Sequence, residues 1–336
     1  MSGNSAPLRV GIIGCGLIGD KRAKAIGSWG RLTACADREL GRAEALARPR
    51  GARAYADWRD LAKAEDVDLV IIATAHDSLA EITLAAVEAG KHVLVEKPAA
   101  RRSHELAAVI EARDRVGVKV HVGFNHRYHR SLQKARELIS GGGLGELMFL
   151  RARYGHGGRI GYEKEWRADP KLSGGGELID QGPHLIDLSR WFLGEFAKVD
   201  GFAHTYFWDM PVDDNAFMTL RTAREQTAFL HVSCSEWKNL FSMEIYGRDG
   251  KIELNGLGGS YGVERITFYK MLPEMGPPET YAWEYPMADN SWSVEMEAFA
   301  RQIQADEPCD CGLEDAKAAL EIVEKIYEVS GYDYRT

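Results

Sequence analysis

The residues whose types and placement suit catalysis are Lys97, Asp180 and His184. Lys97 follows an apolar run, residues 92–95, and precedes Pro98, which cannot donate to a strand ladder. We therefore expect Lys97 at the carboxyl end of a parallel strand, where open α/β sheets bind ligands. A lysine ammonium in that place can hold a ligand oxygen and stabilise negative charge that develops on it.

Asp180 and His184 are four residues apart in segment 174–187, which opens with three glycines. If the segment is helical, both side chains lie on one face of the helix. The glycines and Pro183 predict an irregular first half, with the regular helix starting near Pro183. A histidine titrates near neutral pH and could exchange a proton with a substrate. Taken alone, however, this spacing is more typical of a helix cap followed by a core histidine.

A glycine-rich turn, Gly14-Cys15-Gly16-Leu17-Ile18-Gly19, follows the first apolar run, residues 8–13. In this G-x-G-x-x-G spacing the glycines permit a tight turn, close approach of a pyrophosphate, and close helix packing. A second strand ends at Asp37, where an acid would hold the ribose 2′-hydroxyl of a dinucleotide. Asp37 favours NAD because it would repel a 2′-phosphate. Arg38 could pair with that phosphate, so NADP stays open, or it is a solvated side chain.

The elements that must position these residues fall into two groups. Through residue 125 the apolar runs alternate with helical stretches, which is typical of a parallel, doubly wound sheet. From residue 126 on, β segments follow one another without helices between them, which predicts a mostly antiparallel sheet with a few covering helices. We therefore predict an α/β fold with a Rossmann domain in residues 1–125 and a substrate-binding and oligomerisation α+β domain in residues 126–336.

Composition and charge narrow the class of protein. The 336 residues carry a net charge of −8 at pH 7, which disfavours nucleic acid or an anionic membrane as the main partner. No apolar stretch reaches the roughly 20 residues of a membrane-spanning helix, and the polar N-terminus does not read as a secretion signal. Five sparse cysteines fit a reducing cytoplasm. Cys309 and Cys311 have no second pair with which to bind zinc, so no metal is predicted.

Four motifs in combination make the chain resemble the Gfo/Idh/MocA oxidoreductases, the family of glucose–fructose oxidoreductase and inositol dehydrogenase. They are Gly14-x-Gly16-x-x-Gly19, Glu96-Lys97-Pro98, Gly123-Phe124-Asn125-His126-Arg127, and Gly174-Gly175-Gly176 followed by Asp180 and His184. The resemblance implies an open sheet that often mediates oligomerisation, so a homodimer or homotetramer is expected. It also implies hydride transfer between a nicotinamide and a sugar or cyclitol. Lys97 would contact the reacting oxygen, with His184 as acid/base and Asp180 beside them.

The chain departs from this family in one segment. Members commonly carry T-P-x-x-x-H after the third strand, whereas this chain has Thr74-Ala75-His76. Thr74 and His76 are candidates for lining the nicotinamide side, and the alternative for His76 is a surface residue that opens a helix. The expected cofactor contacts are Gly14, Cys15, Gly16, Leu17, Ile18, Gly19, Asp37, Arg38, Thr74, His76, Glu96, Lys97 and Asn125.

The glycine-laced loop of residues 153–167 carries aromatic side chains and three arginines just before the catalytic segment. Aromatic faces suit a pyranose, and arginine forks suit phosphate or carboxylate. A phosphorylated or nucleotide sugar is therefore one hypothesis, and a loop that merely packs is the alternative. The expected substrate contacts are Lys97, Arg127, Tyr154, Tyr162, Trp166, Arg167, Asp180 and His184. Asn125 and Arg127 could instead tie the domain junction together.

Two other functions stay open on the sequence. One is an NAD-assisted glycosidase of the same fold, which recycles a tightly held cofactor. Many such enzymes are exported, so the polar N-terminus argues against it. The other is a non-catalytic nicotinamide-binding protein, and the presence of Lys97, Asp180 and His184 argues against that reading.

Overall fold

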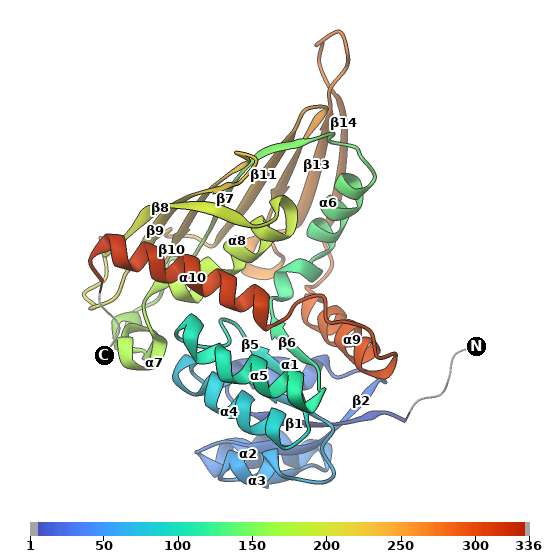
Figure 1. Ribbon diagram of the computed structural model, residues 1–336, viewed down its shortest axis with the longest axis vertical. Coiled ribbons are helices and arrows are strands. Elements are labelled where there is room, and N and C mark those ends of the chain that lie inside the picture. The colour runs from blue at the N-terminus through green and yellow to red at the C-terminus, as the bar shows by residue number, and fades with distance from the viewer. Residues whose placement is uncertain (1–5, 333–336) are drawn as a thin grey trace. The chain divides into compact units, whose positions relative to one another are not determined.

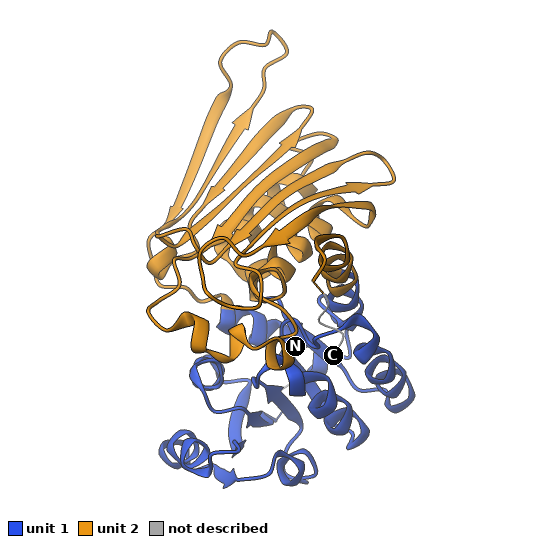
Figure 2. Cartoon of the chain, turned by 90° about the vertical axis from the view of Figure 1, so that its left-hand side faces the viewer, with its two compact units in different colours: residues 1–124, 292–318 blue, residues 125–291, 319–336 orange. Residues whose placement is uncertain are grey.

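Residues 6–332 are described in the computed structural model, and their contacts divide the chain in two (Figure 2). Unit 1 is Met1–Phe124 with Trp292–Ala318, and unit 2 is Asn125–Ser291 with Ala319–Thr336. The sequence-based division placed residues 292–318 in the second domain, whereas here they group with unit 1. The physical reason is that α9 (Ser291–Gln304) supplies Trp292 and Glu295 to a buried arginine of the first unit.

Unit 1 contains, within the described residues, a six-stranded sheet of order β3-β2-β1-β4-β5-β6, with parallel pairing throughout. The central strands read as unbroken apolar runs because helices cover both faces of such a sheet. The order reverses between β1 and β4, and ligands bind at such a reversal. The strands are β1 (Leu8–Ile13), β2 (Gly30–Ala36), β3 (Arg53–Tyr55), β4 (Leu69–Ile72), β5 (His92–Glu96) and β6 (Val120–Gly123). The helices are α1 (Leu17–Ala25), α2 (Leu40–Ala47), α3 (Trp58–Ala62), α4 (His76–Glu88), α5 (Leu106–Val116) and α9.

Unit 2 is built, over its described residues, on an eight-stranded sheet of order β14-β13-β12-β11-β7-β10-β9-β8. Strands β7 and β10 pair in parallel, and the pairs on either side of them are antiparallel. The strands are β7 (Leu147–Gly155), β8 (Phe196–His204), β9 (Asn215–Thr222), β10 (Thr227–Ser233), β11 (Leu240–Gly247), β12 (Gly250–Asn255), β13 (Glu264–Lys270) and β14 (Glu279–Tyr285). The two sheets together confirm the predicted α/β fold with a parallel and a mostly antiparallel sheet.

One face of the second sheet is covered by helices. Helix α8 (Glu177–Leu193) packs on β7, β9 and β10, and α6 (Arg130–Ser140) packs on β12, β13 and β14 (Figure 1). The alternation along β11 follows from this, because Phe241, Met243 and Ile245 are buried and their neighbours are not. The remaining helices are α7 (Pro170–Ser173) and α10 (Leu313–Ser330). None of the helices formed by residues 6–332 has the length and hydropathy to cross a bilayer.

Candidate active site

The glycine loop connects β1 to α1, and the local geometry requires glycine at two of its three glycine positions. Gly14 has a positive φ of 91°, and a Cβ there would lie 2.5 Å from the carbonyl oxygen of Ala73. A Cβ on Gly19 would collide with the carbonyl oxygen of Gly14. Gly16 caps α1, and a Cβ on it would meet nothing within 4 Å. The helix N-terminus therefore faces open space at Gly16, which fits an anion such as a pyrophosphate.

Asp37 lies directly beside this loop. Its Oδ2 accepts a hydrogen bond from the backbone N–H of Cys15 (2.8 Å), and its Oδ1 accepts one from the N–H of Glu39 (2.9 Å). Arg38 is exposed next to it, as is Leu17 on the loop, and Cys15 and Ile18 are half-buried. The predicted cofactor residues of β1, α1 and β2 are thus brought together at the carboxyl edge of the sheet.

Replacing Asp37 with alanine is expected to raise the KM for NAD by about 10- to 100-fold. This change corresponds to the free energy of one lost hydrogen bond to a charged group. The KM for NADP should change less, because the carboxylate that repels a 2′-phosphate is gone. Steady-state kinetics with both cofactors measure the ratio. Asp57→Ala is the control, because Asp57 is an exposed acid of the same unit that caps α3. An unchanged cofactor ratio in Asp37→Ala would contradict the assignment.

Lys97 directly follows β5, as predicted, and is half-buried. Its neighbour Glu96 is turned into the protein and accepts a hydrogen bond from Arg22 Nε (2.7 Å). Arg22 is fully buried, pairs also with Glu295, and lies under the Trp292 ring, 4.4 Å from its centroid. Burial raises the pKa of Glu96, and the charge of Arg22 opposes that rise. Within unit 1, Arg22 thus ties α1, β5 and α9 together, and its bond to Glu96 fixes the strand end that bears Lys97.

Thr74 and His76 follow β4 on the same edge of the sheet. Thr74 Oγ1 accepts a hydrogen bond from Ser78 Oγ (2.9 Å). His76 is the first residue of α4 and is 4% exposed, so it opens a helix but is not a surface residue. The missing proline and histidine of the family pattern therefore do not displace this segment from the ligand-binding edge.

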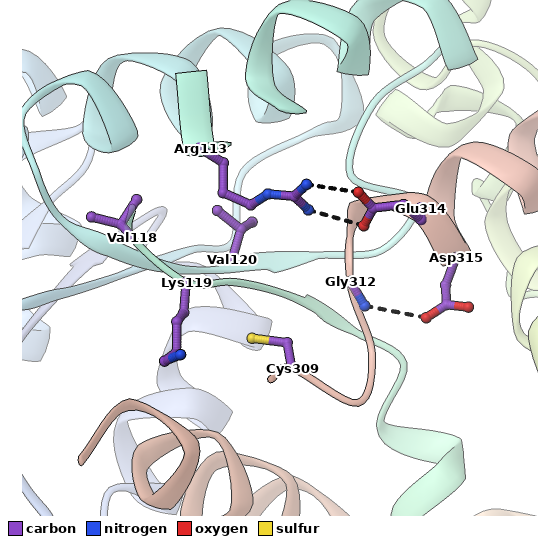
Figure 3. A pocket seen from close by; sticks show the side chains of 8 residues that line it. All are labelled: Arg113, Val118, Lys119, Val120, Cys309, Gly312, Glu314 and Asp315. Carbon is purple, nitrogen blue, oxygen red and sulfur yellow. Dashed lines mark hydrogen bonds and ion pairs between the residues drawn. The ribbon is translucent and has the colours of Figure 1, made fainter. Parts of the chain in front are cut away.

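Figure 3 shows a pocket of about 390 Å³ in unit 1 that lies elsewhere. Val118, Lys119 and Val120 line it at the amino end of β6, whereas ligands bind at carboxyl ends. Its charges are largely paired, since Arg113 donates to both Glu314 oxygens at 2.9 and 2.7 Å. We therefore do not assign the cofactor to this pocket.

In unit 2, the helix that carries the predicted catalytic pair starts earlier than the sequence indicated. Helix α8 begins at Glu177 and runs through Pro183. Asp213 caps it from a distant loop, because its carboxylate accepts from the N–H groups of Gly176 (2.9 Å) and Leu178 (2.7 Å). A Cβ on Gly176 would collide with the Asp213 backbone, and one on Gly175 would collide with the Tyr327 hydroxyl. The glycine run therefore permits the close approach that holds this helix end.

The Asp213 cap predicts an unusual pH dependence of stability. Burial raises the pKa of Asp213 to about 6, although its hydrogen bonds to Leu178, Tyr327 and Gly176 oppose the rise. The folded chain therefore binds this proton more tightly than the unfolded chain. The stabilisation is present in full below the ordinary pKa of 3.8 and is lost as the pH rises through about 6. The difference of about two pH units corresponds to about 3 kcal/mol.

Urea unfolding at about pH 4 and about pH 7 measures this effect. We expect Asp213→Asn to lose about 2 kcal/mol of the pH-dependent difference seen in the wild type, because the unfolded carboxyl is already more than half ionised at about pH 4. Asp214→Asn is the matched control for the loss of a buried carboxylate, because Asp214 also accepts backbone hydrogen bonds, from Tyr206 and Phe207. Equal pH dependence in wild type and Asp213→Asn would refute the assignment.

Asp180 and His184 lie one turn apart on α8, as predicted, and are 5% and 4% exposed. Asp180 Oδ2 accepts a hydrogen bond from Arg167 Nε (2.9 Å). The Asp180 charge raises the pKa of Arg167, and the adjacent guanidinium in turn favours the ionised form of the Asp180 carboxylate. The guanidinium also lies over the half-buried Trp166 ring, 4.6 Å from its centroid. Two residues expected at the substrate, Arg167 and Asp180, are therefore an ion pair with each other.

His184 also contacts a residue to which the sequence analysis gave no role. The His126 ring stacks on it with centroids 3.7 Å apart and planes at 27°. Tyr154, which is buried, sets its ring edge-on to both, at 5.0 Å from His126 and 6.1 Å from His184. The sequence did contain one indication of a role for His126, because it lies between Asn125 and Arg127, two candidate ligand-binding residues.

Asn125 and Arg127 flank that histidine and make buried contacts of their own. Asn125 Nδ2 donates to Ser291 Oγ (2.9 Å). Arg127 donates two hydrogen bonds to the carboxylate of Asp187 on α8, and the Nε–Oδ2 distance is 2.8 Å. These contacts support the alternative in which both residues hold the structure together rather than meet a ligand.

The loop before the catalytic helix is held by its own charges and rings. Arg159 pairs with Glu165 at 2.7 Å, next to the Arg167–Asp180 pair. Tyr162 is buried against His156, with 5.5 Å between the ring centroids. Two of the three arginines that suggested an anionic substrate, Arg159 and Arg167, are thus paired with local acids.

One cluster in unit 2 has donor atoms that could bind a metal ion. Ligand atoms of His129, Glu264 and Asp289 lie within 4.8 Å of one another. His129 Nδ1 is 2.9 Å from Glu264 Oε1, closer than the about 3.3 Å between two ligands of a tetrahedral zinc. Burial would raise the pKa of Glu264, but His129 and Ser131 hold it below its ordinary value. These features are those of a hydrogen-bonded side-chain pair.

Two family models match the chain. One, described as the oxidoreductase family with an NAD-binding Rossmann fold, matches residues 8–124. The other, described as the GFO/IDH/MocA C-terminal domain, matches residues 132–253. Both matches fall where the sequence motifs lie, and together they take in the glycine loop, Lys97, Asp180 and His184.

Named relatives extend the match. Inositol 2-dehydrogenase 2 of Saccharopolyspora erythraea is 34% identical over 313 residues, which is 89% of this chain and 84% of that protein. Levoglucosan dehydrogenase of Pseudarthrobacter phenanthrenivorans is 31% identical over 65% of this chain. The match spans 59% of that protein, less than two thirds of its length. The structure of a levoglucosan dehydrogenase in complex with NADH and levoglucosan superposes on this chain with a TM-score of 0.85. The superposition covers 97% of each chain at 24% identity, so the two proteins share the fold. The chain therefore belongs to the Gfo/Idh/MocA family of oxidoreductases, and its first unit carries that family's NAD-binding Rossmann fold.

Proposed function

We propose that this protein is an NAD-dependent dehydrogenase that acts on a secondary alcohol carbon of a neutral sugar or cyclitol. The observation that carries the proposal is the buried His184 one turn from the ionised Asp180 on α8. A histidine in that setting can accept a hydroxyl proton, and the neighbouring carboxylate stabilises the imidazolium that forms. The relatives named for inositol and levoglucosan support an uncharged, polyhydroxylated substrate.

Each residue has a defined task in this proposal. His184 takes the proton of the substrate hydroxyl during oxidation and returns it in reduction. Lys97 holds the reacting oxygen and stabilises its developing negative charge. Asp180, kept ionised by Arg167, balances the charge on His184. NAD, when bound, supplies the carbon that accepts the hydride.

The cofactor half of the proposal rests on the loop geometry of unit 1. The open space at Gly16 leaves the N-terminus of α1 available to the pyrophosphate. Asp37, oriented by the N–H groups of Cys15 and Glu39, would take the adenine ribose hydroxyls. Thr74 and His76 would lie on the nicotinamide side.

A neutral substrate is favoured over a phosphorylated one by the arginine contacts of unit 2. Arg159 and Arg167 are already matched by Glu165 and Asp180 at 2.7 and 2.9 Å. A phosphate would have to break these pairs and leave buried Asp180 without its counter-charge, which is costly. The hypothesis of a nucleotide sugar is therefore the weaker one.

A substrate panel tests this choice. NADH formation is measured with myo-inositol, levoglucosan and methyl glucoside, and with glucose 6-phosphate and a nucleotide-linked glucose. We expect kcat/KM for at least one neutral compound to exceed that for the charged compounds by about tenfold or more. Preference for a phosphorylated or nucleotide-linked sugar would contradict the proposal.

We also propose that the protein forms a homodimer or homotetramer through the open face of the second sheet. Phe202, Phe217 and His231 form a row there, with adjacent centroids 5.2 and 4.2 Å apart. Phe229 on the same face is 50% exposed. Exposed aromatic side chains grouped in this way are typical of a protein interface. Sedimentation of wild type and Phe229→Glu tests the assignment, and a wild-type monomer would refute it.

We further propose that the protein resides in the cytoplasm. Its cysteines are free thiols, and Cys35, Cys234 and Cys311 are buried in the cores of the two units. Such thiols persist in a reducing compartment. Fractionation of the source cells, with detection by antibody, tests this location.

A further inference from the structure

The stacked pair of His126 and His184 has a chemical consequence beyond packing. The two rings come from distant segments, a short 3-10 helix (Asn125–Tyr128) and α8. Their centroids are 3.7 Å apart, and the side chains are only 5% and 4% exposed. At this separation the π face of one ring is in direct contact with the other. A positive charge that forms on the His184 ring therefore interacts directly with the ring of His126.

The position and tautomer of His126 are set by Asn125. Asn125 Nδ2 donates to Ser291 Oγ at 2.9 Å, so its amide oxygen is turned toward His126. That oxygen lies 3.3 Å from His126 Nδ1, which therefore carries a proton and donates it. Tyr154 packs edge-on against the same ring. Asn125 and Tyr154 thus contact the edge of the His126 ring and leave its face against His184.

The other charged and titratable groups around the pair already have ionic or hydrogen-bonded partners. On α8, Asp180 pairs with Arg167 and Asp187 pairs with Arg127. Beside His126, His129 pairs with Glu264. The titratable groups in ring contact with the pair are His129, next to the 3-10 helix, and Tyr154 of β7, which in turn contacts Tyr261. His184 shares α8 with Glu177, Asp180 and Asp187, and His126 shares the 3-10 helix with Arg127. A second proton on His126 would repel the first on His184, so His126 is the neutral member when His184 is charged.

We propose that His126 is a positioning residue whose neutral ring face holds His184 in place and stabilises the imidazolium that His184 becomes during alcohol oxidation. The inference rests on the proposed role of His184 as the acid/base. A cation is attracted to the face of an aromatic ring, and the attraction grows when water is excluded. Because the protonated form of His184 is stabilised, His184 is a stronger base and removes the substrate's hydroxyl proton more readily.

Two substitutions of similar size separate this role from simple packing. His126→Phe and His126→Leu both fill the space, and both remove the contact with Asn125 and the titrating nitrogen. They differ in one respect, since only phenylalanine presents a π face to His184. The pH profile of kcat/KM for sugar oxidation is measured for both, with NADH binding and the melting temperature as checks on folding.

We expect the acidic limb of the leucine variant about one pH unit below that of the phenylalanine variant, and its kcat about tenfold lower. The limb moves to lower pH because His184 without the ring face holds its proton less tightly. Identical profiles for the two variants would overturn the inference, wherever the shared limb falls. His184→Ala is run in parallel. If it keeps wild-type turnover, the proposed function of His184 fails. If it is inactive while the two His126 variants agree, only the role of His126 fails.

Discussion

Methionine in place of Lys97 is expected to lower kcat by about 100- to 1,000-fold while NADH still binds, because one preorganised donor to a developing oxyanion is lost. Methionine keeps the length and flexibility of the side chain but removes its charge. The strand end should stay in place, since the Glu96–Arg22 pair holds it independently of Lys97. Initial rates give kcat, and a fluorescence titration with NADH gives the binding constant.

Lys91 provides a matched control for that substitution. It precedes the same strand at its opposite end and donates to the carbonyl oxygens of Ala64 and Val67 at 2.7 and 2.8 Å. Lys91→Met should lower stability and leave kcat near the wild-type value. If Lys97→Met retained wild-type turnover, Lys97 would have no role at the reacting oxygen.

Alanine in place of His184 is expected to lower kcat by about 100- to 10,000-fold, the contribution of a positioned general acid/base. The acidic limb of the rate profile should disappear with it, because the titrating base is removed. Rates measured across the pH range report both effects. His204→Ala is the control, since His204 lies exposed on β8 of the same unit. A His184→Ala enzyme that kept the limb would place the base elsewhere.

The sequence predicted the parts of the site that local rules determine. The glycine loop, Asp37 and Lys97 all lie where a strand meets a turn, and short-range sterics fix such places. The predicted start of α8, near Pro183, was late by more than one turn because the residues that cap the helix, Asp213 and Tyr327, are distant in sequence. Glycine and proline in that segment predicted irregular backbone, and tertiary contacts overrode them.

Other features depend on contacts that no local pattern encodes. Strands β8 and β14 at the two edges of the second sheet are largely exposed and lack the alternation that marks a half-buried strand. The loop arginines looked like anion ligands because their partners were not visible, although Arg159 and Glu165 are only six residues apart. The His126–His184 stack joins two distant segments and needed the structure to be seen.

If the protein is a dehydrogenase, the hydrogen of the substrate's carbinol carbon must end on the nicotinamide. A neutral sugar that the enzyme turns over is deuterated at the carbinol carbon and incubated with NAD, and the products are analysed by mass spectrometry. We expect deuterated NADH and a keto sugar in equal amounts. Hydrolysis of a glycoside without net NADH would indicate an NAD-assisted glycosidase. Neither product with any sugar would indicate a protein that only binds the cofactor, and either result would contradict the account.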